Sequence, residues 1–169
     1  MRINEDYIDV MDREDAYDNV NSMLDKDLRD EYFCHQIDLI LSGEQPESRP
    51  DFRHADDAIY QVDNDSIKDV ISAISKSYGL TEYLNLNWID TSGVTSMDHL
   101  FGRLFEMKID VNISRWDVSN VTDMSYMFAQ KRFNSDITGW DVSSVRDMSY
   151  MFEMSSFNGD ISGWDTRSL

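Results

Sequence analysis

Carboxylates are the side chains of this chain most able to do chemistry, because Asp and Glu supply 33 of its 169 residues. The stretch Asp63-Asn64-Asp65 begins like the loop of an EF-hand, in which oxygen ligands at alternating positions hold calcium. That loop also needs a glycine at its sixth position and a bidentate glutamate at its twelfth, where this chain has Ile74. The motif therefore does not predict a calcium site.

A second pair of carboxylates, Asp136 and Asp160, recurs 24 residues apart within the motif Asn-x-Asp-Ile. Such a repeated aspartate can hold an ion, or it can accept hydrogen bonds from the backbone of a turn. We favour turn hydrogen bonding, and the ion site is the alternative. Carboxylate pairs of the glycosidase kind can be chosen freely among so many acids, so no such pair is predicted.

Nucleophiles and metal ligands are sparse. Cys34 and His35 are neighbours in sequence, but adjacent residues of a helix do not face each other, so they do not predict a nucleophile and its base. His35, His54 and His99 lack metal-ligand spacing, and each is interpreted as an ordinary surface or core histidine. There is no glycine-rich phosphate loop. We therefore expect no enzyme activity, no catalytic residue, no cofactor and no metal.

The elements that must position any functional side chain come from an internal repeat. Residues 116–139 and 140–163 are identical at 16 of 24 positions without a gap. A third unit begins at Trp164, and a degraded unit with insertions begins at Trp88. Self-similarity at this period is typical of stacked repeats, each of which buries its apolar face against its neighbours. Such a stack offers an extended surface, so the pattern favours binding over catalysis.

Each repeat is predicted to contain a strand, a turn, a short helix and a returning loop. The spacing of Met148, Met151 and Phe152 is helical, whereas residues 157–164 fit a short strand. About four short parallel strands are expected, near residues 84–87, 112–115, 136–139 and 160–163, with short helices near 95–101, 121–128 and 145–152. Stacking should bury two ladders of side chains: Ile113, Ile137 and Ile161, and Phe101, Phe128 and Phe152.

The repeated motif WDVSxVxDMSYMF, followed by FNxDISGW, resembles the BspA-like leucine-rich repeats of bacterial surface proteins, the family also called DUF285 or PARCEL repeats. The resemblance covers about residues 80–169. It implies an α/β fold, a right-handed leucine-rich-repeat-like solenoid that binds other macromolecules and brings no catalytic residues. Residues 129–132 and 153–156 depart from the family, because they replace its usual small, cysteine-containing loop.

The first part of the chain differs in composition from the repeats. Of the net charge of −18, −13 falls in residues 1–65 and −5 in residues 66–169. We predict one domain of acidic, mainly helical residues 1–65 and a second domain, residues 66–169, that joins a capping helix to the repeats. The capping helix is predicted at residues 66–78 from its apolar stripe, with Ser66 and Asp69 as a capping box.

Charge and composition also limit the location and the partners. Direct binding to nucleic acid is disfavoured, because phosphate contact needs patches of Lys and Arg. There is no run of about 20 apolar residues, so no membrane span is predicted. With one cysteine there is no disulfide framework, and the first residues carry no apolar signal-peptide core. We expect a cytoplasmic protein, or a surface protein if a leader precedes Met1.

Two non-enzymatic functions remain. The first is a protein-binding module built on the repeats. The second is an acidic intracellular inhibitor, such as an immunity or phage anti-defence protein, that masks a basic, nucleic-acid-handling surface of its target. The four tryptophans could be core or a binding row, and we favour core. The predicted partner-binding residues are Asp12, Glu14, Asp15, Asp18, Asp25 and Asp27 in the acidic region, and Tyr126 and Tyr150 in the repeats.

Overall fold

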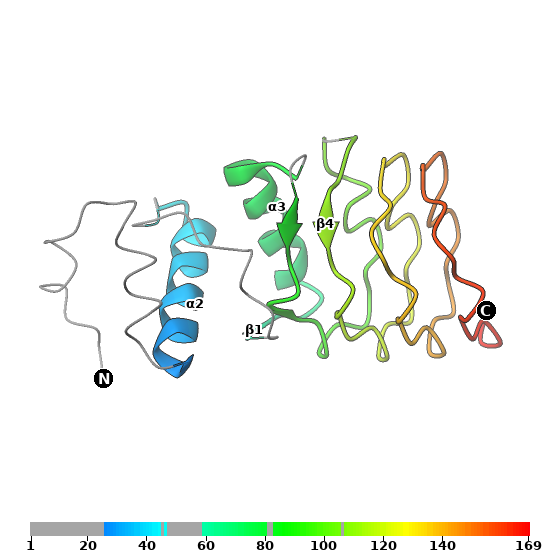
Figure 1. The fold of residues 1–169 in the computed structure, drawn as a ribbon, viewed down its shortest axis with the longest axis horizontal. Helices are drawn as coiled ribbons and strands as arrows, with labels where there is room; N and C mark the ends of the chain where they lie inside the picture. Colours follow the sequence, from blue (N-terminus) through cyan, green and yellow to red (C-terminus); the bar gives the residue numbers. More distant parts are fainter. Residues whose placement is uncertain (1–25, 45, 47–58, 81–82, 106) are drawn as a thin grey trace, which may run out of the picture. The chain divides into compact units, whose positions relative to one another are not determined.

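The computed structural model describes residues 26–44, 46, 59–80, 83–105 and 107–169, and the chain divides into two compact units, residues 1–50 and 51–169. The described fold is mixed α/β, with two helices and short parallel strands that close into no barrel (Figure 1). Neither of these two helices is both long and apolar enough to cross a membrane.

In the first unit, the described element is the helix α2 (Lys26–Ser42). Its residues Phe33, Ile37 and Ile40 are buried, as the helical spacing of the apolar residues predicts. The helix ends at Gly43, whose φ of 81° is the left-handed conformation that glycine adopts readily at helix C-termini.

The second helix, α3 (Ser66–Tyr78), lies where the capping helix is predicted. It turns an apolar stripe into the core: Ile67, Val70, Ile71 and Ile74. The helix N-terminus differs from the prediction, because Ser66 is already helical and cannot cap it. Asp65, the residue before the helix, makes no side-chain cap hydrogen bond. The Oδ1 of Asp63 instead accepts hydrogen bonds from the N–H groups of Asp65 at 3.2 Å and Ser66 at 2.9 Å. Gly79 follows the last helical residue, as predicted.

Two pairs of two-residue strands join segments that are far apart in sequence. β1 (Tyr60–Gln61) pairs in parallel with β3 (Ile89–Asp90), and β2 (Leu84–Asn85) pairs in parallel with β4 (Val111–Asn112). The N–H of Val62 extends the first pair by donating to the carbonyl oxygen of Asp90 at 3.1 Å. The second unit therefore includes residues that precede α3.

β2 and β4 coincide closely with two of the strands predicted from the sequence. The strands predicted near residues 136–139 and 160–163 are wrong, since the described chain has no strand at either place. Both places hold an aspartate turn. The Oδ1 atom of Asp136 accepts a hydrogen bond from the N–H of Thr138 at 3.0 Å, and Asp160 accepts one from the N–H of Ser162 at 2.9 Å. The same kind of hydrogen bond also occurs in β2 and β4, at Asn85 and Asn112, so the turn alone does not exclude a strand.

We number the repeats 1 (residues 88–115), 2 (116–139) and 3 (140–163); Figure 1 shows them side by side from green to orange. The short helices predicted within them are also wrong, because the described repeats have turns and isolated bridges in those segments and no helix. Backbone N–H groups that would donate within a helix donate across repeats instead. The His99 N–H donates to the Ser125 carbonyl at 2.9 Å, and the Tyr126 N–H to Ser149 at 3.0 Å.

The tryptophans belong to the core, as favoured from the sequence. Trp88, Trp116 and Trp140 are buried, and Trp164 is half-buried on the last repeat. Three indole N–H groups donate to main-chain carbonyl oxygens that lie just before the preceding tryptophan: Trp116 to Leu86 at 2.8 Å, Trp140 to Ile113 at 3.1 Å, and Trp164 to Ile137 at 3.2 Å. The tryptophan row is therefore structural and is not an exposed binding surface.

The phenylalanine ladder continues this core. The ring of Phe128 stacks on Phe101 at 5.4 Å and on Phe152 at 5.8 Å between ring centroids. Burial is confirmed for Phe128 and Ile137. It is wrong for Phe152, which is half-buried, and for Ile161, which is 36% exposed, because no further repeat among the described residues packs against repeat 3.

The alanine substitution Phe128→Ala should lower the free energy of unfolding by about 3–5 kcal/mol, since it empties a fully buried aromatic site. Phe152→Ala should lower it less, because part of the Phe152 side chain is already exposed. Urea unfolding followed by tryptophan fluorescence reports on the repeats, since all four tryptophans lie in residues 88–164. Equal losses in the two variants would contradict this account of the ladder.

Candidate functional site

Three equivalent residues of the repeats form a stacked row outside the core, which we call the aromatic row: His99, Tyr126 and Tyr150. The His99 and Tyr126 rings lie 4.6 Å apart between centroids at 16°, and the Tyr126 and Tyr150 rings lie 4.8 Å apart at 18°. His99 and Tyr126 are half-buried, whereas Tyr150 is 58% exposed. The row therefore offers ring edges and polar atoms along its length, and an exposed tyrosine at its end.

The backbone at the aromatic row is unusual. His99, Tyr126 and Tyr150 have φ values of 56°, 55° and 59°, in the left-handed region that bulky side chains rarely adopt. Hydrogen bonds from the N–H groups of His99 and Tyr126 to the next repeat hold this conformation in place. The same conformation recurs at the same position of all three repeats, so it is a regular feature of the repeat fold.

An aspartate turn precedes each tyrosine of the row. Asp123 Oδ1 accepts a hydrogen bond from the Ser125 N–H, and Asp147 Oδ1 accepts one from the Ser149 N–H, each at 2.8 Å. Hydrogen bonds from the Ser149 hydroxyl and N–H hold the pKa of Asp147 below 3.8. The turn interpretation of Asp136 is likewise confirmed, because its carboxylate accepts from Thr138. The residues that the structure describes contain no cluster of three or more His, Cys, Asp or Glu that could hold a metal ion.

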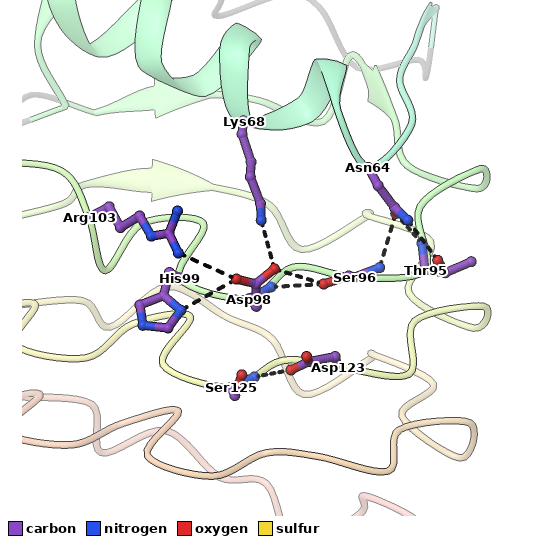
Figure 2. Close-up of polar contacts among 9 residues, drawn as sticks. All are labelled: Asn64, Lys68, Thr95, Ser96, Asp98, His99, Arg103, Asp123 and Ser125. Atoms are coloured by element: carbon purple, nitrogen blue, oxygen red, sulfur yellow. Dashed lines mark hydrogen bonds and ion pairs between the residues drawn. The ribbon is translucent and has the colours of Figure 1, made fainter.

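Repeat 1 exchanges the serine and the aspartate of this turn, as Figure 2 shows. Ser96 stands where repeats 2 and 3 have aspartate, and Asp98 stands where they have serine. The exchange brings the Asp98 carboxylate to 2.6 Å from Lys68 Nζ on α3 and 3.4 Å from Nδ1 of His99. Burial opposes ionisation of Asp98, but hydrogen bonds from Lys68 and Ser96 outweigh it and hold its pKa below 3.8.

Asn64 makes the second connection between the start of α3 and repeat 1. Its Oδ1 accepts hydrogen bonds from the N–H groups of Thr95 at 2.8 Å and Ser96 at 3.1 Å, and its Nδ2 donates to Thr95 Oγ1 at 2.9 Å (Figure 2). These contacts and the Asp63 cap account for the Asp63-Asn64-Asp65 motif. The side-chain oxygens of Asp63 and Asn64 bind the protein backbone.

The surroundings of the aromatic row are acidic. The pKa of Tyr126 is raised above 10 by burial first, then by the neighbouring Tyr150, Glu153 and Asp147. Tyr126 therefore stays protonated at neutral pH, and its hydroxyl is able to donate a hydrogen bond. Carboxylates beside exposed aromatic rings favour partners that carry positive charge.

The structure brings two of the residues predicted to bind a partner, Tyr126 and Tyr150, into one row. Five of the predicted residues lie outside the described part of the chain: Asp12, Glu14, Asp15, Asp18 and Asp25. Asp27 lies in the first part of α2, residues 26–32, whose side chains are not described. Sequence reasoning missed His99. The signal was present, because His99 aligns with Tyr126 and Tyr150 when one allows for the insertions in repeat 1.

A shallow hollow beside β4 is another candidate binding surface of this unit. It is lined by Tyr83, Lys108, Ile109, Asp110, Val111, Asn112, Arg132, Asn134, Ser135 and Asp136. Its formal charges balance, since Lys108 and Arg132 stand against Asp110 and Asp136, and Lys108 Nζ lies 3.3 Å from Asp110 Oδ2. The aromatic row therefore offers the more distinctive chemistry.

A family model described as "Mycoplasma protein of unknown function, DUF285" matches residues 66–169. The match begins at the first residue of α3 and runs through all the repeats. No curated protein and no solved structure matches the chain. The description of the family names no activity.

Acid should weaken the second unit. The pKa values of Asp136, Asp141, Asp147 and Asp160 lie below 3.8 through hydrogen bonds from residues two positions on, and Arg167 lowers that of Asp165 to about 2. A depressed folded-state pKa contributes stability that is complete above the unfolded value of about 3.9 and is lost as pH falls through the folded value. We expect urea midpoints to drop between about pH 4 and pH 2.

Asp136→Asn keeps an oxygen acceptor for Thr138 but cannot titrate, so its midpoint should depend less on pH than that of the unchanged chain. A midpoint that stays constant between about pH 5 and pH 2 would contradict a role for ionised turns.

Proposed function

The chain belongs to the DUF285 family, and on that premise we propose that it is a non-enzymatic module that binds another protein. The repeats would form a right-handed solenoid of the leucine-rich-repeat kind. Hydrogen bonds between equivalent residues of successive repeats, and parallel bridges from Ser96 to Asp123 and from Asp123 to Asp147, support this arrangement. A stack of this kind presents one continuous surface to a partner.

The observation that carries the proposal is the aromatic row. Tyrosine is over-represented among the residues that dominate binding energy, because it gives a large rigid contact and a hydroxyl at low entropic cost. Tyr150 is 58% exposed, and Tyr126 stays protonated and stacks on it. With Asp147 and Glu153 close by, the row suits a partner with a basic surface.

The double variant Tyr126→Asn/Tyr150→Asn tests this function. Asparagine tolerates the left-handed φ of both positions, so the fold should persist while the rings are lost. A partner captured from a lysate of the source cells, then purified, should bind the variant at least about tenfold more weakly by calorimetry. Phe105→Asn removes another fully exposed aromatic residue outside the row and should leave the affinity unchanged. Equal affinity of the double variant and the unchanged chain would reject the row as the binding surface.

A second candidate function is favoured by the distribution of charge. Residues 1–65 carry −13 of the total charge of −18, more than solubility alone requires. We propose as the alternative a cytoplasmic inhibitor whose acidic region covers a basic, nucleic-acid-handling surface of its target. In that case Asp12, Glu14, Asp15 and their neighbours would steer the encounter, and the aromatic row would add contacts.

Reversal of three charges in Asp12→Lys/Asp15→Lys/Asp18→Lys should slow association with the purified partner and change dissociation much less. Raising the salt concentration from about 0.01 to 1 M should slow association of the unchanged chain, because the Debye length falls from about 30 to 3 Å. Surface plasmon resonance separates the two rates. If neither salt nor the charge reversal changes the association rate, the inhibitor function is contradicted and the repeat-based binding module remains.

A further inference from the structure

Repeat 3 has backbone N–H groups whose equivalents in repeats 1 and 2 donate hydrogen bonds to the following repeat, whereas its own donate none within the described part of the chain. In repeats 1 and 2, every second residue of the segment around the aromatic row donates its backbone N–H to a carbonyl oxygen of the following repeat. Four such bonds leave repeat 2, at 2.7–3.0 Å: Met124 to Asp147, Tyr126 to Ser149, Phe128 to Met151 and Gln130 to Glu153. The acceptors are every second carbonyl oxygen of the next segment.

The corresponding donors of repeat 3, which we call the terminal donor row, are the N–H groups of Met148, Tyr150, Phe152 and Met154. Among the described residues, none accepts a hydrogen bond from these groups. The residues that follow repeat 3 pack elsewhere, since the Trp164 indole donates to Ile137 and the Ser168 hydroxyl donates to Ser143.

The terminal donor row offers donors and no acceptors. Every carbonyl oxygen of residues 147–153 already accepts a hydrogen bond, either from repeat 2 or from within its own turn. The φ values of Tyr150 and Met154, 59° and 53°, belong to the backbone conformation that turns successive N–H groups toward one side. A second copy offering the same edge would set donors against donors, so two copies do not satisfy each other there.

The side chains beside the terminal donor row add two requirements. One side of the Tyr150 ring stacks on Tyr126, and no ring of the described residues stacks on its other side. The His99–Tyr126 pair shows that either an imidazole or a phenol fits such a position. Asp147 and Glu153 flank the row, so positive charge on the occupant is favoured over negative charge.

We propose that the terminal donor row binds an extended basic peptide segment of a partner protein, parallel to residues 147–153, with a ring-bearing side chain over Tyr150. Alternate carbonyl oxygens of the peptide would accept from Met148, Tyr150 and Phe152. Strand addition of this kind draws affinity from the main chain and specificity from alternate side chains. The inference rests on the proposed protein-binding function and names the segment that is bound.

The probe is a synthetic peptide that copies residues 145–156, with lysine in place of the residues that copy Asp147 and Glu153. The copied segment is the one that occupies the same donors on repeat 2. In proton–nitrogen spectra of the full chain, the amide signals of Met148, Tyr150 and Phe152 should move downfield, and their exchange with solvent should slow. The lysine peptide should bind about two- to tenfold tighter than the direct copy at low salt.

Two variants give the matched comparison. Tyr150→Gly keeps the N–H and accepts the left-handed φ, but removes the ring, so it should bind the lysine peptide several-fold more weakly. Phe105→Gly removes an exposed aromatic residue of repeat 1 and should bind it as the unchanged chain does. Spectra of each variant without peptide report whether repeats 1 and 2 keep their fold.

Several results would overturn the inference. They are equal binding of a scrambled lysine peptide, shifts confined to the hollow beside β4, equal shifts with inorganic phosphate alone, or shifts of the same amides on concentrating the chain without peptide. If the natural partner still depends on Tyr126 and Tyr150 in any of these cases, the protein-binding function stands and only the strand addition fails. If the peptide binds as described while no partner depends on the row, the proposed function fails instead.

Discussion

The hydrogen bond between an indole N–H and the carbonyl before the preceding tryptophan is the interaction on which the repeat stack depends. It satisfies the indole N–H groups of Trp116, Trp140 and Trp164, and it can form only when successive repeats are in one register. The phenylalanine rings stack because that register places them over each other. The aromatic row follows from the same alignment, because its residues lie two positions before the stacked phenylalanine of each repeat.

The sequence predicted the core well and the backbone of the repeats poorly. Residues equivalent to Trp116 and Phe128 recur at a fixed period, and such a pattern predicts that large apolar side chains are buried at the same period. The same pattern cannot say where an N–H group donates. The Met148–Phe152 spacing of three and four residues fits a helix, but it equally fits a turn that sends its N–H groups to the next repeat.

The candidate site was predictable in part, for a related reason. Tyr126 and Tyr150 stood out because they alternate with buried methionines, whereas His99 differs from them in residue type and sits after an insertion. The sequence alone does not show that the exchange of Ser96 and Asp98 has a structural role. Only the position of Lys68 on α3 shows that it supplies the carboxylate for an ion pair between the helix and the first repeat.

The shared direction of the N–H groups makes the repeat stack a polar object. Each peptide unit has a dipole moment of about 3.5 D, and units that point the same way add. Repeats 1 and 2 contribute such units at Met97 and Met124, whose N–H groups both donate to the following repeat. A duplicated 24-residue unit would lengthen this array without reversing it, and the two ends of any longer stack would stay electrically unlike.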